Sequence, residues 1–230
     1  MSDAAQSRIE THQILCLFDN WAQLDQGAIV LASSEAATTG EPTLDLSAAN
    51  LLTPDLDTAW RSESLAYLLS IEPIVLAPRT PTVSILFDLG QPRAVDKVAL
   101  HRHNVRVPVS FELFKISPYD GGLPVYESGW LDPIVRASLS DFAWTDLAWT
   151  LGPSTRKLET LQAEFKLNSV FTTDEVYYGV RFVRVFFDNS EGSNAGVDYL
   201  HVGYPFIGRG FQPEVNIVLG WGETGIDPSE

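Results

Sequence analysis

The sequence predicts an all-β fold, an antiparallel β-sandwich with at most one or two short helices. Apolar and polar residues alternate along several short stretches, as they do in strands with one buried face. Clusters of Gly, Pro, Asn, Asp and Ser separate these stretches at intervals typical of a sandwich. Helical periodicity is too rare for an α/β fold, in which helices alternate with strands.

The first part of the chain predicts short strands joined by polar loops. Residues 1–11 are polar and predict an N-terminal arm. Short apolar stretches predict strands at 14–18 and 28–32. Residues 33–48 are rich in Ser, Thr, Ala, Gly and Pro and predict a surface loop. Residues 50–62 predict a compact turn that ends near Trp60, whose large side chain we expect to fill the core.

The middle of the chain contains the clearest strand patterns. Residues 65–77 favour either a short helix or a pair of strands. Strands are predicted at 82–89, 94–101 and 107–113. Every second residue is apolar in the first and third, and Val98 and Leu100 share one face of the second. The first of them places Val83, Ile85, Phe87 and Leu89 on one face. These apolar faces are the predicted core.

The second half of the chain alternates between loops and strands. Gly, Pro and Tyr dominate residues 117–130, which predict a long loop. Residues 142–150 predict a strand or hairpin, and residues 156–167 are the best helix candidate, with a strand as the alternative. An apolar, β-branched stretch at 176–187 predicts a long strand, and 197–204 predicts the last one.

We therefore expect one sandwich domain over residues 12–204, followed by an extended C-terminal arm at 205–230. The arm is rich in Gly and Pro yet apolar, so we expect its side chains to be buried on the domain or on a neighbouring subunit. The candidates for such an interface are Phe206, Ile207, Phe211, Ile217, Leu219 and Trp221.

Charge and composition narrow the classes of partner. The 15 Lys and Arg oppose 30 Asp and Glu, a net charge of −15 that disfavours nucleic acid and anionic membrane surfaces as partners. Cys16 is the single cysteine, so no intrachain disulfide can form. No signal-peptide pattern and no apolar run of membrane-spanning length is visible, which leads us to expect a soluble protein made in the cytoplasm.

Short motifs along residues 28–206 follow the order found in galactose-binding-like domains. They are A-S-S at 32–34, D-T-A-W at 57–60, D-L-G at 88–90, V-D-K-V-A-L at 95–100, V-R-F-V-R-V at 180–185 and V-D-Y-L-H-V-G at 197–203. In this order the chain resembles the discoidin, or coagulation-factor type C, superfamily. The resemblance implies a galactose-binding-like jelly roll, without the disulfide that links the domain ends in secreted members.

Two further motifs are similar to those of discoidin-like proteins in phage tail tips and prophages. They are H-R-H-N at 101–104 and Y-L-H-V-G-Y at 199–204. This resemblance implies a structural virion protein of a tail tip or baseplate, located in the mature tail. Its partners would be copies of itself and other tail proteins, with host-surface glycan as a further contact.

Metal binding has two candidate sites. Many discoidin-like domains hold calcium near the Asn/Asp turn, where this chain has Asp55 and Asp57 but Thr53 in place of the first expected acidic ligand. The same carboxylates could instead cap the turn. His101 and His103 lie two residues apart on a predicted strand, where they could share a metal ion or act as hydrogen-bonded strand-end residues. No other cofactor is expected.

No nucleophile, P-loop, zinc-protease or dinucleotide motif occurs, so we do not expect an enzyme. The aromatic side chains in loop-like segments are Tyr119, Tyr126, Trp130, Trp144 and Trp149. They could stack on sugar rings, although packing in the core or between subunits is the favoured alternative. The leading hypothesis is the tail-tip structural protein. A stand-alone carbohydrate-binding module is the alternative, and a glycan hydrolase is the least favoured class.

Overall fold

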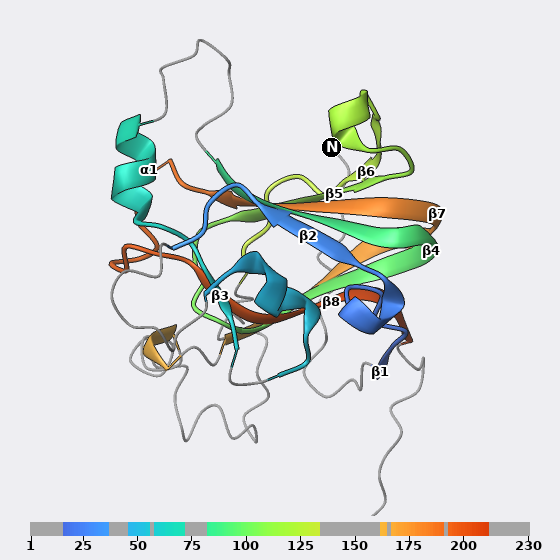
Figure 1. Ribbon diagram of the computed structural model, residues 1–230, viewed down its shortest axis with the longest axis horizontal. Helices are drawn as coiled ribbons and strands as arrows, with labels where there is room; N and C mark the ends of the chain where they lie inside the picture. Colours follow the sequence, from blue (N-terminus) through green and yellow to red (C-terminus); the bar gives the residue numbers. More distant parts are fainter. Residues whose placement is uncertain are drawn as a thin grey trace, which may run out of the picture.

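The computed structural model describes residues 16–36, 46–55, 58–71, 82–133, 162–164, 167–190 and 193–211. These residues form an antiparallel β-sandwich whose two layers are joined by two long strands, β4 (Thr82–His103) and β7 (Leu167–Asp188) (Figure 1). Each long strand bends near its middle and contributes one half to each layer. The predicted all-β, antiparallel fold class is confirmed.

The first layer has the order β2, β4, β7, β5 and β6. Its short strands are β2 (Ile29–Ala32), β5 (Val109–Phe114) and β6 (Pro124–Glu127). In this layer residues 82–88 of β4 pair with residues 182–188 of β7.

The second layer is built around β8 (His201–Phe211), which pairs with residues 97–103 of β4. On its other side β8 pairs with β1 (Cys16–Phe18) near its end and with β3 (Trp60–Arg61) near its start. The start of β7 completes the layer beside β4.

The bend of β4 lies at the D-L-G motif. Gly90 has φ of 74°, a conformation that side chains other than glycine's rarely allow. A Cβ on Gly90 would lie 2.7 Å from the carbonyl oxygen of Gly27, so no other residue fits there. The segments 82–89 and 94–101, predicted as separate strands, are therefore one bent strand.

The core between the layers follows the predicted alternation. Val83, Ile85, Phe87 and Leu89 are each at most 3% exposed. Trp60 is fully buried, its Nε1 donates a hydrogen bond of 2.9 Å to the Ser34 carbonyl, and its ring stacks on Phe187. The expectation that Trp60 fills the core is confirmed.

Helices are few and short in the described residues. They are α1 (Leu65–Ile71) and the 3₁₀ turns η1 (Leu24–Gln26), η2 (Ala48–Leu52) and η3 (Pro118–Asp120). Of the segment predicted as a helix at 156–167, Gln162 and Ala163 are helical, and Leu167 already begins β7. A search of the described residues finds no helix with the length and apolar character needed to cross a membrane.

The last strand runs past residue 204, where the sequence predicts the sandwich to end. β8 continues to Phe211, and its backbone pairs with both β4 and β1, so residues 205–211 belong to the sandwich. Phe206 is 6% exposed and Ile207 is fully buried, so these two side chains are buried on the domain itself, the first of the two expected alternatives, and not on a neighbouring subunit. The N-terminal arm and the interface candidates Ile217, Leu219 and Trp221 lie outside the described residues.

Candidate functional site: a polar pocket beside the β5–β6 turn

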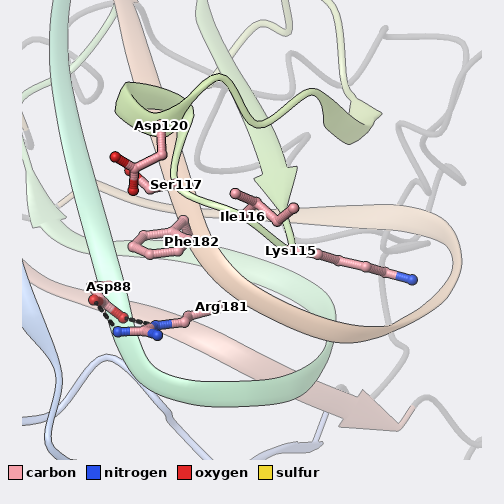
Figure 2. Close-up of a pocket in the computed structure, with 7 residues that line it drawn as sticks. All are labelled: Asp88, Lys115, Ile116, Ser117, Asp120, Arg181 and Phe182. Carbon is pink, nitrogen blue, oxygen red and sulfur yellow. Dashed lines mark hydrogen bonds and ion pairs between the residues drawn. The ribbon is translucent and has the colours of Figure 1, made fainter.

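A pocket of about 490 Å³ lies where the bend of β4 meets β7 and the turn after β5. Its lining residues are Asp88, Lys115, Ile116, Ser117, Asp120, Arg181 and Phe182 (Figure 2). Four of these side chains carry charge, two of each sign, so the pocket is close to neutral in a strongly acidic chain.

Asp88 and Arg181 form a two-pronged ion pair at one side of the pocket. Arg181 Nε and Nη2 donate to Asp88 Oδ1 and Oδ2, each over 3.0 Å. This hydrogen bond, and then the charge of Asp88, raises the pKa of Arg181. The Gly90 N–H also donates to Asp88 Oδ1, over 2.9 Å. The Asp88 carboxylate thus bonds both to the bend of β4 and to Arg181 on β7, which fixes its orientation.

The opposite side of the pocket is formed by the turn between β5 and β6. The Ser117 hydroxyl accepts from the Tyr119 N–H, and the Ser117 carbonyl accepts from the N–H groups of Asp120 and Gly122. A Cβ on Gly122 would collide with the Ile116 carbonyl, which makes glycine necessary at this close approach. The tightly bonded turn leaves the Tyr119 side chain 74% exposed beside Asp120.

Figure 2 shows the Phe182 ring between Asp120 and Ser117 on one side and the Asp88–Arg181 pair on the other. Lys115 extends away from this group. Within the described part of the chain, the Asp120 carboxylate has no hydrogen-bond or ion-pair partner. An aromatic ring is thus flanked by an acceptor that is open to a ligand and by a fixed guanidinium.

This combination suits a small ligand that has an apolar face and several hydroxyl groups. The Phe182 and Tyr119 rings offer apolar faces, Asp120 accepts hydrogen bonds, and the remaining N–H groups of Arg181 donate them. The pocket has the volume typical of small-molecule sites. A hydrolase would need one carboxyl group as a proton donor. Both oxygens of Asp88 already accept from Arg181, so the pair Asp88 and Asp120 is poorly suited to that chemistry.

Of the predicted glycan residues, the three that the structure describes, Tyr119, Tyr126 and Trp130, do not lie together. Tyr126 is partly buried and packs against the edge of the core, with its ring centre 5.6 Å from that of Phe111 and 5.0 Å from that of Tyr177. Burial raises its pKa, with a smaller contribution from Asp174. This result agrees with the packing alternative.

Trp130 is half exposed but lies next to Leu131, whose backbone pairs with Val109 at the start of β5. Tyr119 lies past the other end of β5, roughly 17 Å away along a strand of this length. Trp144 and Trp149 lie outside the described residues. Of the three candidates that the structure describes, Tyr119 alone adjoins the pocket.

No sequence pattern marked Asp88, Asp120, Arg181 and Phe182 as site residues. Asp88 lies in the D-L-G motif, and Arg181 and Phe182 lie in the V-R-F-V-R-V motif, both of which indicate the fold. In the D-L-G motif a carboxylate at the end of a predicted strand precedes a glycine. Such a pattern can indicate that the carboxylate is fixed at a bend of the chain. The partner on β7 carries no comparable signal, because its contact with Asp88 spans 93 residues.

The histidine metal site is contradicted. Arg102, between the two histidines, has φ of 52°, and the pairing of β4 with β7 is irregular there. His103 is fully buried: its Nδ1 accepts from the Val105 N–H over 3.0 Å, and Nε2 lies 2.9 Å from the Ser169 hydroxyl. His101 instead stacks on the partly exposed Tyr204. The two imidazoles therefore cannot meet one ion.

Burial lowers the pKa of His103 to about 3, with smaller contributions from His101 and His201, so the ring is neutral at pH 7. With Nδ1 accepting, Nε2 carries the proton and donates to Ser169, whose hydroxyl in turn donates to the Pro133 carbonyl. His103 is thus a hydrogen-bonded structural residue.

The calcium prediction stays a prediction. Asp55 is exposed, and its carbonyl accepts from the Thr58 hydroxyl over 3.2 Å, while Asp57 lies outside the described residues. The residues that the structure describes contain no group of three His, Cys, Asp or Glu side chains able to hold a metal ion.

No protein-family model and no curated protein matches this sequence. Among solved structures, the chain is similar to chitosan-binding module 1 of a chitosanase/glucanase from Paenibacillus sp. IK-5, with 13% identity and a TM-score of 0.47 over 83% of this chain and 98% of that one.

It is also similar to the family 32 CBM of C. perfringens NanJ in complex with galactose, with 11% identity and a TM-score of 0.44 over 84% of this chain and 98% of that one. The lectin domain of lectinolysin, complexed with Lewis B antigen, has 14% identity and a TM-score of 0.44, covering 83% and 96% of the two chains. At such identities the likeness concerns the fold alone. These structures give no support to the predicted tail-tip role.

Proposed function

We propose that this domain is a carbohydrate-binding module, and that it binds a glycan in the pocket between β4, β7 and the β5–β6 turn. The observation that carries the proposal is the open Asp120 carboxylate, which lies across the Phe182 ring from the Asp88–Arg181 pair. Similar solved structures include sugar-binding modules, but the proposal rests on the residues of the pocket.

A sugar ring has an apolar face made of C–H groups and an edge of hydroxyl groups. The apolar face would stack on the ring of Phe182 or of the exposed Tyr119. Aromatic side chains suit such a contact because they offer a large apolar surface and lose little conformational freedom on binding. The hydroxyls would donate to Asp120 and accept from Arg181. Because the charges of the pocket cancel, a neutral sugar is the expected ligand. The volume of about 490 Å³ suits one or two sugar units.

Tyr119→Ala and Asp120→Ala are expected to weaken glycan binding at least about tenfold each, equivalent to roughly 1.4 kcal/mol. Tyr119 is 74% exposed, so its truncation removes a ligand contact without opening the core. A glycan array would identify a ligand, and isothermal titration calorimetry would then compare the variants with the unchanged chain.

Trp130→Ala is the matched control, since this half-exposed aromatic side chain lies near the other end of β5 and should not affect binding. Wild-type affinity in Asp120→Ala would contradict the pocket as the site. A correctly folded chain that binds nothing on a broad array would contradict glycan binding itself.

The tail-tip or baseplate role stays a prediction from the sequence. The segments expected to make assembly contacts, residues 1–11 and the apolar residues after 211, lie outside the described residues. Electron microscopy of the purified chain, alone and with tail proteins, would test it. The expectation that the protein is not an enzyme is likewise untested.

A further inference from the structure

A second cluster of polar side chains lies in the other layer of the sandwich and shares no residue with the pocket. Arg61 on β3 pairs in register with His201 on β8. Arg102 on β4 lies opposite Gly203, between the paired positions His101–Tyr204 and His103–Val202. A Cβ on Gly203 would lie 3.0 Å from the Cβ of Arg102, so the glycine leaves room for the Arg102 side chain.

Arg61 and Arg102 lie on the two strands that flank β8, opposite His201 and Gly203 respectively. Burial lowers the pKa of His201 to about 4, and the positive charges of Arg102 and then Arg61 add to this effect. At pH 7 the cluster therefore combines two fixed positive charges with a neutral imidazole.

Neither guanidinium has an acidic partner in the described part of the chain. Arg61 lies over the Tyr199 ring, with Cζ 3.6 Å from the ring centre, and Arg102 is exposed. Arg181 and Arg184, by contrast, form ion pairs with Asp88 and Glu112 over 3.0 and 2.6 Å. In a chain with net charge −15, two neighbouring arginines without a carboxylate are unexpected.

The backbone at Arg102 holds this arrangement. Its φ of 52° is a left-handed conformation that residues other than glycine rarely adopt. The Arg102 N–H donates to Asn168 Oδ1 over 3.1 Å, which fixes the irregular turn of the strand. Irregularities of this kind redirect a side chain, and here the redirected side chain is an exposed guanidinium.

We infer that Arg61 and Arg102, beside His201, bind an oxyanion, namely a carboxylate or sulfate group carried by a ligand. Guanidinium groups offer planar pairs of N–H donors that match the oxygens of such anions. The Arg61 guanidinium packs on the Tyr199 ring and is therefore already oriented before a ligand binds, which lowers the entropic cost of binding. This inference does not depend on the glycan pocket.

Titrations with sodium sulfate, sodium acetate, a heparin oligosaccharide and oligogalacturonate test the inference, at constant ionic strength because salt screens exposed charges. The readouts are the NMR signals of the arginine side chains and the pKa of His201. Binding should raise that pKa, because the bound negative charge opposes the two guanidiniums. Arg61→Gln and Arg102→Gln should each weaken binding at least about tenfold.

Arg209→Gln is the matched control, because it removes the same charge from the far end of β8, roughly 26 Å from His201 along the strand. Binding of only the sulfated probes, or of only the carboxylated ones, identifies the anion, and binding of both supports a general oxyanion site. An equal loss of affinity in Arg209→Gln would show that the anions are attracted by positive charge in general, and would overturn the inference. No binding of any probe, or an unchanged His201 pKa at saturation, would also overturn it.

Discussion

A chain that ends after Tyr204 is expected to fail to fold, whereas a chain that ends after Phe211 is expected to keep the sandwich. The shorter chain loses the part of β8 that pairs with residues 97–100 of β4 and with all of β1. It also loses the buried Phe206 and Ile207. Removing one large buried side chain costs roughly 2–5 kcal/mol, so losing both, together with the strand pairing, equals or exceeds the stability of a typical domain.

Circular dichroism during heating and limited proteolysis would compare the two truncated chains with the full one. The chain ending at Phe211 is the control, since it retains every described strand. Ile207→Ala in the full chain should lower the free energy of unfolding by roughly 2–5 kcal/mol. A cooperative transition near that of the full chain in the version ending at Tyr204 would show that residues 205–211 are not part of the core.

Stability is expected to fall by about 2 kcal/mol between pH 7 and pH 5 through His103 alone. The folded protein holds the pKa of this imidazole at about 3, while the unfolded chain takes up a proton near pH 6.5. Between these two pKa values the unfolded state therefore binds more protons than the folded state. The contribution of the neutral His103 to the free energy of unfolding is complete above pH 6.5 and is lost as the pH falls toward 3. The pKa of His201 is lowered to about 4, so this histidine also reduces the stability of the folded protein as the pH falls.

Urea unfolding at pH 5, 6 and 7 would measure this dependence. His103→Gln should reduce the slope with pH, whatever it does to stability at pH 7, because the titrating group is gone. His101→Gln is the matched control, because it removes a histidine from the same strand and keeps the buried His103. A His103 signal that titrates near pH 6.5 in the folded protein, followed by NMR, would contradict the buried, neutral imidazole.

The strands with one buried face could be predicted because alternation is a local property. Val83, Ile85 and Phe87 lie in the core as their spacing indicates. The end of the domain could not be predicted in this way. Gly208 and Gly210 in β8 resemble loop residues, yet a Cβ at Gly208 would collide with the Asp19 backbone. These glycines permit close packing inside the sheet, and the contacts that require them are distant in sequence.

The positions of His101 and His103 also could not be predicted from local alternation. Regular alternation places His101 and His103 on one side of the strand, but a single irregular residue, Arg102, separates their environments. The left-handed backbone at Arg102 depends on the Asn168 side chain of the neighbouring strand. A local pattern contains no information about such a contact.

The sequence by itself determined the fold class, the core faces of the main strands and the place of Trp60, because burial of every second side chain is encoded locally. Only the tertiary structure decided which side chains meet at a site. Asp88 and Arg181 are 93 residues apart and form an ion pair because β4 and β7 bend together, and the β5–β6 turn brings Asp120 beside them. Strand register, which results from packing of the whole chain, sets these distances.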